Sequence, residues 1–156
     1  MNKRLTMTLL SGFMLGSAIT LQAAPNYTFT DLSSNSSFAI ANAINNQGQI
    51  AGYQSIQVPI PSIPGSTVST FTATLWNGAT GLGTLLTTPT FDVGSVANDL
   101  NDSGQIVGFN SDLSGKTTAI SWENGATTPL PSMNAFYGNP QSINESGEIV
   151  GIIGPD

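Results

Sequence analysis

The side chains of this chain that could take part in chemistry bear oxygen, because the sequence contains neither cysteine nor histidine. Serine–histidine–aspartate triads, cysteine–histidine pairs and the common zinc sites each need one of these two residue types. Any catalysis would therefore rest on carboxylates, hydroxyls, Lys116 or an ion held by oxygen ligands. The lack of cysteine also excludes disulfides and lipidation of an N-terminal cysteine.

Two groups of acidic residues are candidates for carboxylate chemistry. Asp102-Ser103-Gly104 matches the active-site triplet of aspartic proteases, but that reaction needs two matched carboxyls that share a proton. Glu145 and Glu148 flank another turn, and a glycosidase would need them to face each other across a sugar with one pKa raised. At both places we expect solvated turn residues rather than catalytic acids.

Calcium is an alternative ligand for the oxygen-rich segment around residue 100, which contains Asn98, Asp99, Asn101 and Asp102. The spacing of these residues does not match an EF-hand loop, which requires alternating ligands and a distant glutamate. We expect no other metal, no cofactor and no catalytic residues.

The elements that carry these residues are predicted from a glycine turn that occurs three times. An apolar residue and an asparagine precede two polar residues, a glycine and a short strand rich in isoleucine and valine; the three copies are Ile44–Gly52, Leu100–Gly108 and Ile143–Gly151. The turn glycines are Gly48, Gly104 and Gly147. Glycine at this position suits a type I turn closed by a left-handed residue, because only glycine takes positive φ without steric cost.

A second turn signal follows each tryptophan. Trp76 precedes Asn77-Gly78, and Trp122 precedes Glu123-Asn124-Gly125. Asn-Gly after an apolar run is a strong hairpin signal, so Gly78 and Gly125 are also predicted turn glycines. The apolar neighbours of the two tryptophans favour burial in the core over a surface sugar-binding platform.

The spacing of the two signals predicts a repeat. The first recurs after 56 and then 43 residues and the second after 46, and a period in the forties is typical of four-stranded propeller blades. With one odd strand at Tyr27–Leu32, we expect about 11 strands, or about 2.75 four-stranded units of about 45 residues each. The predicted fold is thus all-β, with antiparallel hairpin repeats in an open, propeller-like but incomplete array. A truncated longer array, an open stack or sandwich, and a piece completed by self-association all fit this count.

The combination of motifs resembles the HAF-repeat family of bacterial extracellular proteins. The residues that carry the resemblance are the three glycine turns, the two tryptophan turns and Leu82-Gly83-Thr84-Leu85, and it covers residues 27–152. The resemblance implies secretion and a propeller-like β fold, without an established chemistry. The chain departs from the family where His-Ala-Phe is expected, because Thr72-Ala73-Thr74 and Thr118-Ala119-Ile120 stand there. Any role of that histidine is therefore absent.

The N-terminus has the pattern of a secretory signal. Two basic residues precede the uncharged stretch Leu5–Leu21, which is short for a bilayer-spanning helix and is followed by small residues. Cleavage after Ala23 is favoured, because cleavage after Ala24 would put Pro25 beside the scissile bond. We therefore expect a signal peptide at 1–23, a β-repeat domain at 24–156, and a location in the periplasm, on the cell surface or outside the cell.

The charge of the mature part excludes two partner classes. Lys116 is the only basic residue that remains after removal of the leader, against nine acidic residues. Nucleic-acid binding needs many basic groups to neutralise phosphates, and an anionic membrane repels an acidic protein. We expect no nucleic-acid partner and no membrane insertion after cleavage.

The segment 54–69 lengthens the first interval between repeats and is uncharged. Its candidate partner-binding residues are Ile56, Val58, Pro59, Ile60, Pro61, Ile63 and Pro64. Prolines interleaved with apolar residues predict a stiff, partly polyproline-like loop that docks at low entropic cost. The alternative is a loop that packs over a sheet edge.

These observations predict a secreted or surface-associated, non-catalytic repeat protein that binds or scaffolds an unknown protein or glycan, with self-association as a further option. The alternatives are an extracytoplasmic, carboxylate-dependent enzyme that acts on polysaccharide, and a truncated, non-functional fragment of a longer repeat protein.

Overall fold

The chain is all-β in the computed structural model, which describes residues 27–33, 36, 38–59, 62–88, 93–131 and 135–155. These residues form ten strands and no helix, which confirms the predicted class. The strands are β1 (Ala39–Ile44), β2 (Gln49–Pro59), β3 (Thr67–Asn77), β4 (Gly83–Leu85), β5 (Gly94–Leu100), β6 (Ile106–Ser111), β7 (Thr117–Glu123), β8 (Ala126–Pro129), β9 (Tyr137–Ile143) and β10 (Ile149–Gly154). The signal peptide predicted at 1–23 lies outside the described residues.

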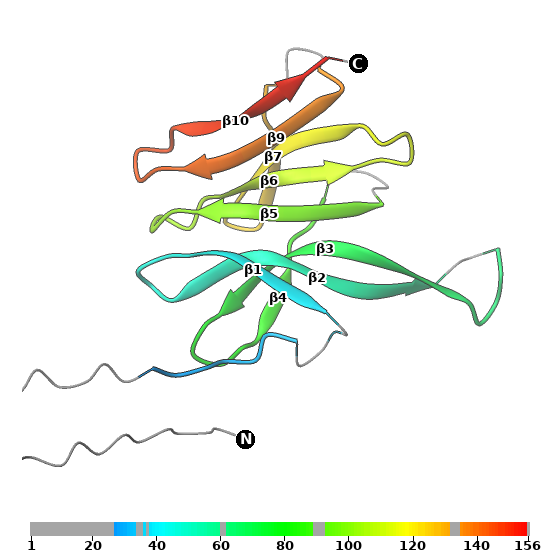
Figure 1. The fold of residues 1–156 in the computed structure, drawn as a ribbon, viewed down its shortest axis with the longest axis horizontal. Helices are drawn as coiled ribbons and strands as arrows, with labels where there is room; N and C mark the ends of the chain where they lie inside the picture. The colour runs from blue at the N-terminus through cyan, green and yellow to red at the C-terminus, as the bar shows by residue number, and fades with distance from the viewer. Residues whose placement is uncertain are drawn as a thin grey trace, which may run out of the picture. The chain divides into compact units, whose positions relative to one another are not determined.

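The strands form one open sheet that curls into a half-barrel (Figure 1). Its order is β1-β2-β3-β5-β6-β7-β9-β10, with β4 paired to β3 and β8 paired to β7. Strands joined by a turn are antiparallel, whereas β3–β5 and β7–β9 are parallel through one residue pair each. We call β1–β4 the first unit, β5–β8 the second unit and β9–β10 the third unit. The outer edges of β1 and β10 are the two ends of this strand order.

The first hairpin of each unit closes with the same turn. Gly48, Gly104 and Gly147 have φ of 73°, 81° and 80°. Each glycine amide donates to the carbonyl of the asparagine three residues before it, at 3.0–3.1 Å. This left-handed backbone is strained for residues with a Cβ, so glycine is required at these positions.

The hairpin of β7 and β8 closes with a two-residue turn at Asn124 and Gly125. Their φ values are 50° and 79°, and Glu123 pairs with Ala126 across the turn. Two successive residues at positive φ define a type I′ turn, in which asparagine followed by glycine is preferred.

The hairpin predicted after Trp76 is formed by β3 and β4, with Gly78 in its turn. Its loop is longer than that of β7 and β8: Gly81 has a φ of 71° and donates to the Asn77 carbonyl at 2.8 Å. Gly78 is held against the turn at Gly48, because its amide donates to the Gly48 carbonyl at 2.8 Å and a Cβ would lie 2.6 Å from that oxygen. Close approach to another turn, rather than positive φ, therefore requires glycine at position 78.

A β-bulge occurs at the same place in the first hairpin of every unit. The ladder skips one residue between Ala41 and Ala43, between Ala97 and Asp99, and between Pro140 and Ser142. A glycine of the facing strand lies opposite each bulge, and a Cβ there would overlap a backbone carbonyl oxygen; the glycines are Gly52, Gly108 and Gly151. The skipped residues are Asn42, Asn98 and Gln141.

The main core lies between the first and second units. Its buried side chains are Ala51, Ala73, Ala97, Leu100, Ile106, Ile120 and Trp122, and Leu86 packs against them. Trp76 and Trp122 are 1% and 2% exposed, which confirms that both are core residues. Small alanines of the first unit thus face large side chains of the second unit, so that the two units interdigitate.

Two predicted features differ in the structure. Tyr27–Leu32 is described but forms no strand, so ten strands are described rather than eleven. Most of segment 54–69 is not a loop: β2 and β3 pair without interruption from Gln49↔Asn77 to Pro59↔Thr67. Apolar β-branched residues favour the strand, and Pro59 is tolerated because it is the last paired residue.

Candidate functional site

The turns of successive units are linked by a ladder of asparagine side chains. Asn45 donates from Nδ2 to the Asn101 carbonyl at 3.2 Å, and Asn101 donates to the Asn144 carbonyl at 3.1 Å. Each of the three asparagines also donates to the side chain four residues on, at 2.6–2.8 Å, and accepts from the amide of that residue at 2.9–3.0 Å. One side-chain type therefore shapes each turn and also joins it to the next unit.

The bulge residues form a second set of links. Asn42 donates to the Ala97 carbonyl at 2.8 Å, and Asn98 donates to the Pro140 carbonyl at 2.6 Å. Sequence reasoning missed this role of Asn42 and Asn98. The available signal was that each precedes its turn asparagine by three residues.

Three of the four acidic residues considered for catalysis or calcium, Asp99, Asp102 and Glu145, lie in contacts between units. Asp102 accepts from the amide and side chain of Asn46 at 2.8 and 2.7 Å. Asp99 accepts from the Ser142 hydroxyl at 2.6 Å. Glu145 accepts from the Asp102 amide at 3.0 Å. Each of these three carboxylates accepts from a donor of the neighbouring unit, whereas Glu148 accepts from Asn144 of its own turn at 2.6 Å.

The electrostatics of Asp102 follow from these contacts. The Asn46 side-chain hydrogen bond, followed by the Asn46 backbone hydrogen bond, holds the pKa of Asp102 below its ordinary value of 3.8. A general acid would need the opposite shift. Among the described residues, no group of three or more His, Cys, Asp or Glu side chains lies close enough together to hold a metal ion.

The predicted partner-binding residues fall on a hairpin that projects beyond the rest of the sheet (Figure 1). Ile56, Val58 and Pro59 lie in β2, and Ile63 and Pro64 lie in the turn; Ile60 and Pro61 lie outside the described residues. Val58, Ile63 and Val68 are exposed. We call residues 56–70 the hairpin arm; among its described residues it carries no charge and presents apolar side chains to solvent.

Three aromatic rings lie at the base of the hairpin arm. Tyr53 and Phe71 meet edge to face with ring centroids 5.5 Å apart, and Phe38 lies 6.2–6.3 Å from both. Phe38 and Phe71 remain about half exposed. Edge-to-face packing stabilises such a cluster, so it forms a rigid base for the arm.

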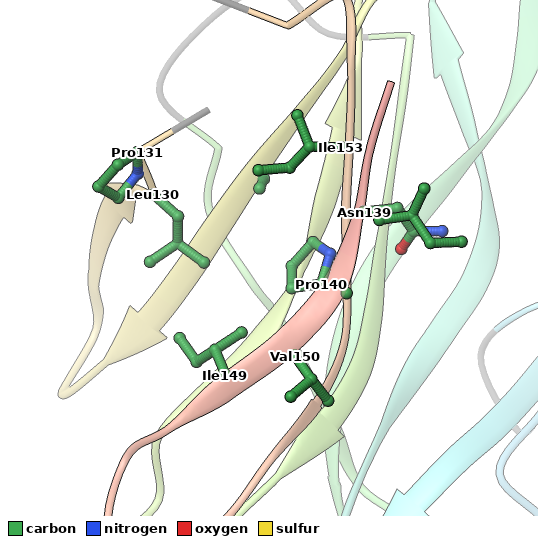
Figure 2. A pocket seen from close by; sticks show the side chains of 10 residues that line it. Leu130, Pro131, Asn139, Pro140, Ile149, Val150 and Ile153 are labelled. Carbon is green, nitrogen blue, oxygen red and sulfur yellow. The ribbon is translucent and has the colours of Figure 1, made fainter. Parts of the chain in front are cut away.

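A cavity of about 520 Å³ opens between the second and third units (Figure 2). Its walls are mostly apolar: Ala119, Leu130 and Pro131 come from the second unit, and Asn139, Pro140, Ile149, Val150, Gly151, Ile152 and Ile153 come from the third. Figure 2 shows Leu130 and Pro131 across from Ile149 and Ile153. Sequence reasoning did not predict this cavity, although the third unit visibly lacks a tryptophan hairpin.

A second cavity, of about 550 Å³, lies between the first and second units. Its walls include Leu75, Thr87, Trp122, Asp102 and Glu123. The Trp122 indole nitrogen donates to the Thr87 carbonyl at 2.6 Å and closes part of this boundary. Asp102 is engaged by Asn46, so the described geometry offers no pair of free carboxylates here.

Comparisons of the chain with protein-family models, with curated proteins and with solved structures gave no match. The described part of the chain contains no helix that could cross a lipid bilayer. Function must therefore be inferred from the surfaces and contacts of this fold.

Proposed function

We propose that this chain is an exported, non-catalytic repeat protein that binds a protein partner through its hairpin arm while the stacked units serve as a rigid scaffold. The units would be successive members of a propeller-like array, related to HAF repeats, with the mature protein in the periplasm, on the cell surface or outside the cell. The observation that carries the proposal is the uncharged arm, which extends past the sheet and exposes the apolar side chains of Val58, Ile63 and Val68.

Exposed apolar side chains gathered on one element favour a protein surface as the partner. Burying them on a partner would stabilise the complex by about 25 cal/mol per Å² of apolar surface. Proteins rarely leave contiguous apolar patches open to water unless the patch binds something. The paired strands and the Phe38–Tyr53–Phe71 cluster hold the arm in one conformation, so little entropy is lost on binding.

The positions of the carboxylates support binding over catalysis. Asp99, Asp102 and Glu145 accept hydrogen bonds that connect units, and such structural roles leave no acid and base poised across a substrate. The polysaccharide-active enzyme therefore remains the second candidate, without a site of its own in the described residues.

Site-specific photo-crosslinking in the producing cell tests the proposal. A photoreactive amino acid at Val68 should yield one recurring crosslinked protein, and the same probe at Leu113, an exposed residue of the β6–β7 turn, should not. The adduct should be competed by unlabelled protein. It should resist competition by a variant in which Asn-Gly replaces residues 58–68, so that Gln57 and Ser69 still pair next to the new turn.

Three further readouts separate the alternatives. The trimmed variant should keep the unfolding transition of the wild type. Loss of folding would instead indicate that the arm packs over a sheet edge and stabilises the fold. New reducing ends after incubation with polysaccharides would support the enzyme instead. Protein recovered outside the cytoplasm should begin at Ala24, and an intact leader would contradict the proposed export.

A further inference from the structure

Part of the cavity between the second and third units matches a place that is packed in the core between the first and second units, beside the second cavity. Ala73 and Ala119 occupy matching places, because the Leu86 amide donates to the Ala73 carbonyl and the Leu130 amide donates to the Ala119 carbonyl, both at 2.8 Å. Ala73 and Leu86 pack in the main core, whereas Ala119 and Leu130 line the open cavity.

The side chains that fill the first of these spaces come from β7. Ile120 and Trp122 pack in the core with Ala73, and both are at most 2% exposed. The indole of Trp122 also donates to the carbonyl of Thr87, the residue after Leu86. The matching carbonyl at the open cavity belongs to Pro131, the residue after Leu130.

Ile120 and Trp122 lie in β7, which pairs with β6. The described sheet contains no corresponding strand beside β10. In the second unit, Ile106 pairs with Trp122 and Gly108 pairs with Ile120. The matching residues of β10 are Ile149 and Gly151, whose outer edge ends the strand order. A free edge exposes backbone donors and acceptors that are suited to pair with another strand.

The side chains of β10 are more exposed than the matching side chains of β6. Val107 is fully buried in the second unit, whereas the matching Val150 is 65% exposed, and Ile152 and Ile153 are also about half exposed. The strand Ile149–Gly154 contains no charged residue and no proline, the two devices that commonly keep edge strands from pairing.

We propose that the outer edge of β10 and the adjoining cavity form an acceptor site for a β-strand of the β7 type, supplied by another polypeptide. The incoming strand would run antiparallel to β10 with tryptophan opposite Ile149 and isoleucine opposite Gly151. Its indole would fill the space beside Leu130 and donate to the Pro131 carbonyl. Pairing supplies affinity through main-chain hydrogen bonds, and the cavity supplies specificity for the aromatic residue.

The site is separate from the hairpin arm and adds a second interface to the proposed function. The type of incoming strand is inferred from the boundary between the first and second units. There Ile120 and Trp122 pack with Ala73 and Leu86, and the Trp122 indole donates to the Thr87 carbonyl. Both described strands of this type, β3 and β7, are already paired within the sheet, so neither of them is the incoming strand.

A peptide with the sequence of this chain's own β7, Thr117–Glu123, is the direct probe. Fluorescence anisotropy with the labelled peptide and the full protein should give saturable binding. Alanine in place of the tryptophan should weaken binding about 30-fold, which is typical of the loss of a buried aromatic anchor. Equal binding of the two peptides would overturn the proposal.

Two lysine variants supply a matched pair. Ile153→Lys places a charge among the residues that line the cavity, whereas Leu113→Lys places the same charge in the exposed β6–β7 turn, outside the lining. Both side chains are at least half exposed, so both variants should fold. Peptide binding should be lost in the first variant and retained in the second.

N-methylated peptides distinguish strand pairing from general apolar adhesion. Methylation of the amides directed at β10 should abolish binding, and methylation of the alternate amides should not, since neighbouring amides of a strand point to opposite edges. If methylation of either set of amides weakened peptide binding equally, strand pairing would be refuted. Self-association that Ile153→Lys disrupts and Leu113→Lys does not, without peptide binding, would show that a second copy covers this face instead.

Discussion

Removal of the Asn101 side chain should destabilise the protein far more than the same change at its two counterparts. Asn101 is 1% exposed and makes three side-chain hydrogen bonds: it donates to Gln105 Oε1 and to the Asn144 carbonyl, and it accepts from the Gln105 amide. In Asn101→Ala these groups lose their partner where water has little access. At about 1 kcal/mol of net stability for each bond, the expected loss is about 3 kcal/mol.

The counterparts provide the comparison. Asn144 shapes the last turn, where no further unit is described and its side chain is exposed, so water can replace its bonds. We expect Asn144→Ala to cost less than about 1 kcal/mol. Asn45 is half-buried and donates to the Asn101 carbonyl, so its alanine variant should fall between the other two.

Urea unfolding followed by the fluorescence of the two buried tryptophans measures these differences. The midpoint should fall in the order Asn144→Ala, Asn45→Ala, Asn101→Ala, with similar slopes, because the surface exposed on unfolding hardly changes. Asn101→Asp tests the donor role of the side chain, since a carboxylate can still accept from the Gln105 amide but can donate neither to Gln105 Oε1 nor to the Asn144 carbonyl. Equal costs at the three positions would refute the claim that the ladder connects the units, because turn shaping alone would then explain the asparagines.

Three further outcomes follow from the structure. Gly108→Ala should cost about 4 kcal/mol or more in urea unfolding, because its Cβ would overlap a backbone carbonyl of the facing strand; a cost below about 1 kcal/mol would contradict this packing. The lowered pKa of Asp102 means that its contribution to stability is present above the ordinary value of 3.8 and is lost as the pH falls through the folded-state value. Asp102→Asn should therefore flatten the acid side of the stability profile, and an unchanged profile would exclude the Asn46 contact as its cause. Trp122→Phe should lower stability by about 2 kcal/mol or more, because a smaller ring replaces the buried indole and the donor to the Thr87 carbonyl is lost; thermal unfolding measures this loss.

The hairpin arm illustrates a feature that the residue pattern located but described wrongly. Its prolines and lack of charge indicated a stiff loop, whereas β2 and β3 remain paired up to Pro59 and Thr67. Local composition does not reveal whether a facing strand satisfies the backbone, and that pairing decides between a loop and a strand. The proposed binding role rests on the same side chains in either conformation.

The sequence by itself determined the all-β class, the requirement for glycine at the turns of positive φ and the burial of both tryptophans. These properties depend on neighbouring residues, because backbone conformation and apolar alternation are local. Only the tertiary structure decided that Asn42, Asn98 and Asp102 join successive units, that Gly78 is held against the turn at Gly48, and that β10 is left with an open edge beside an apolar cavity. Those features arise between residues that are far apart along the chain, and their positions are set by how the units pack rather than by the local pattern.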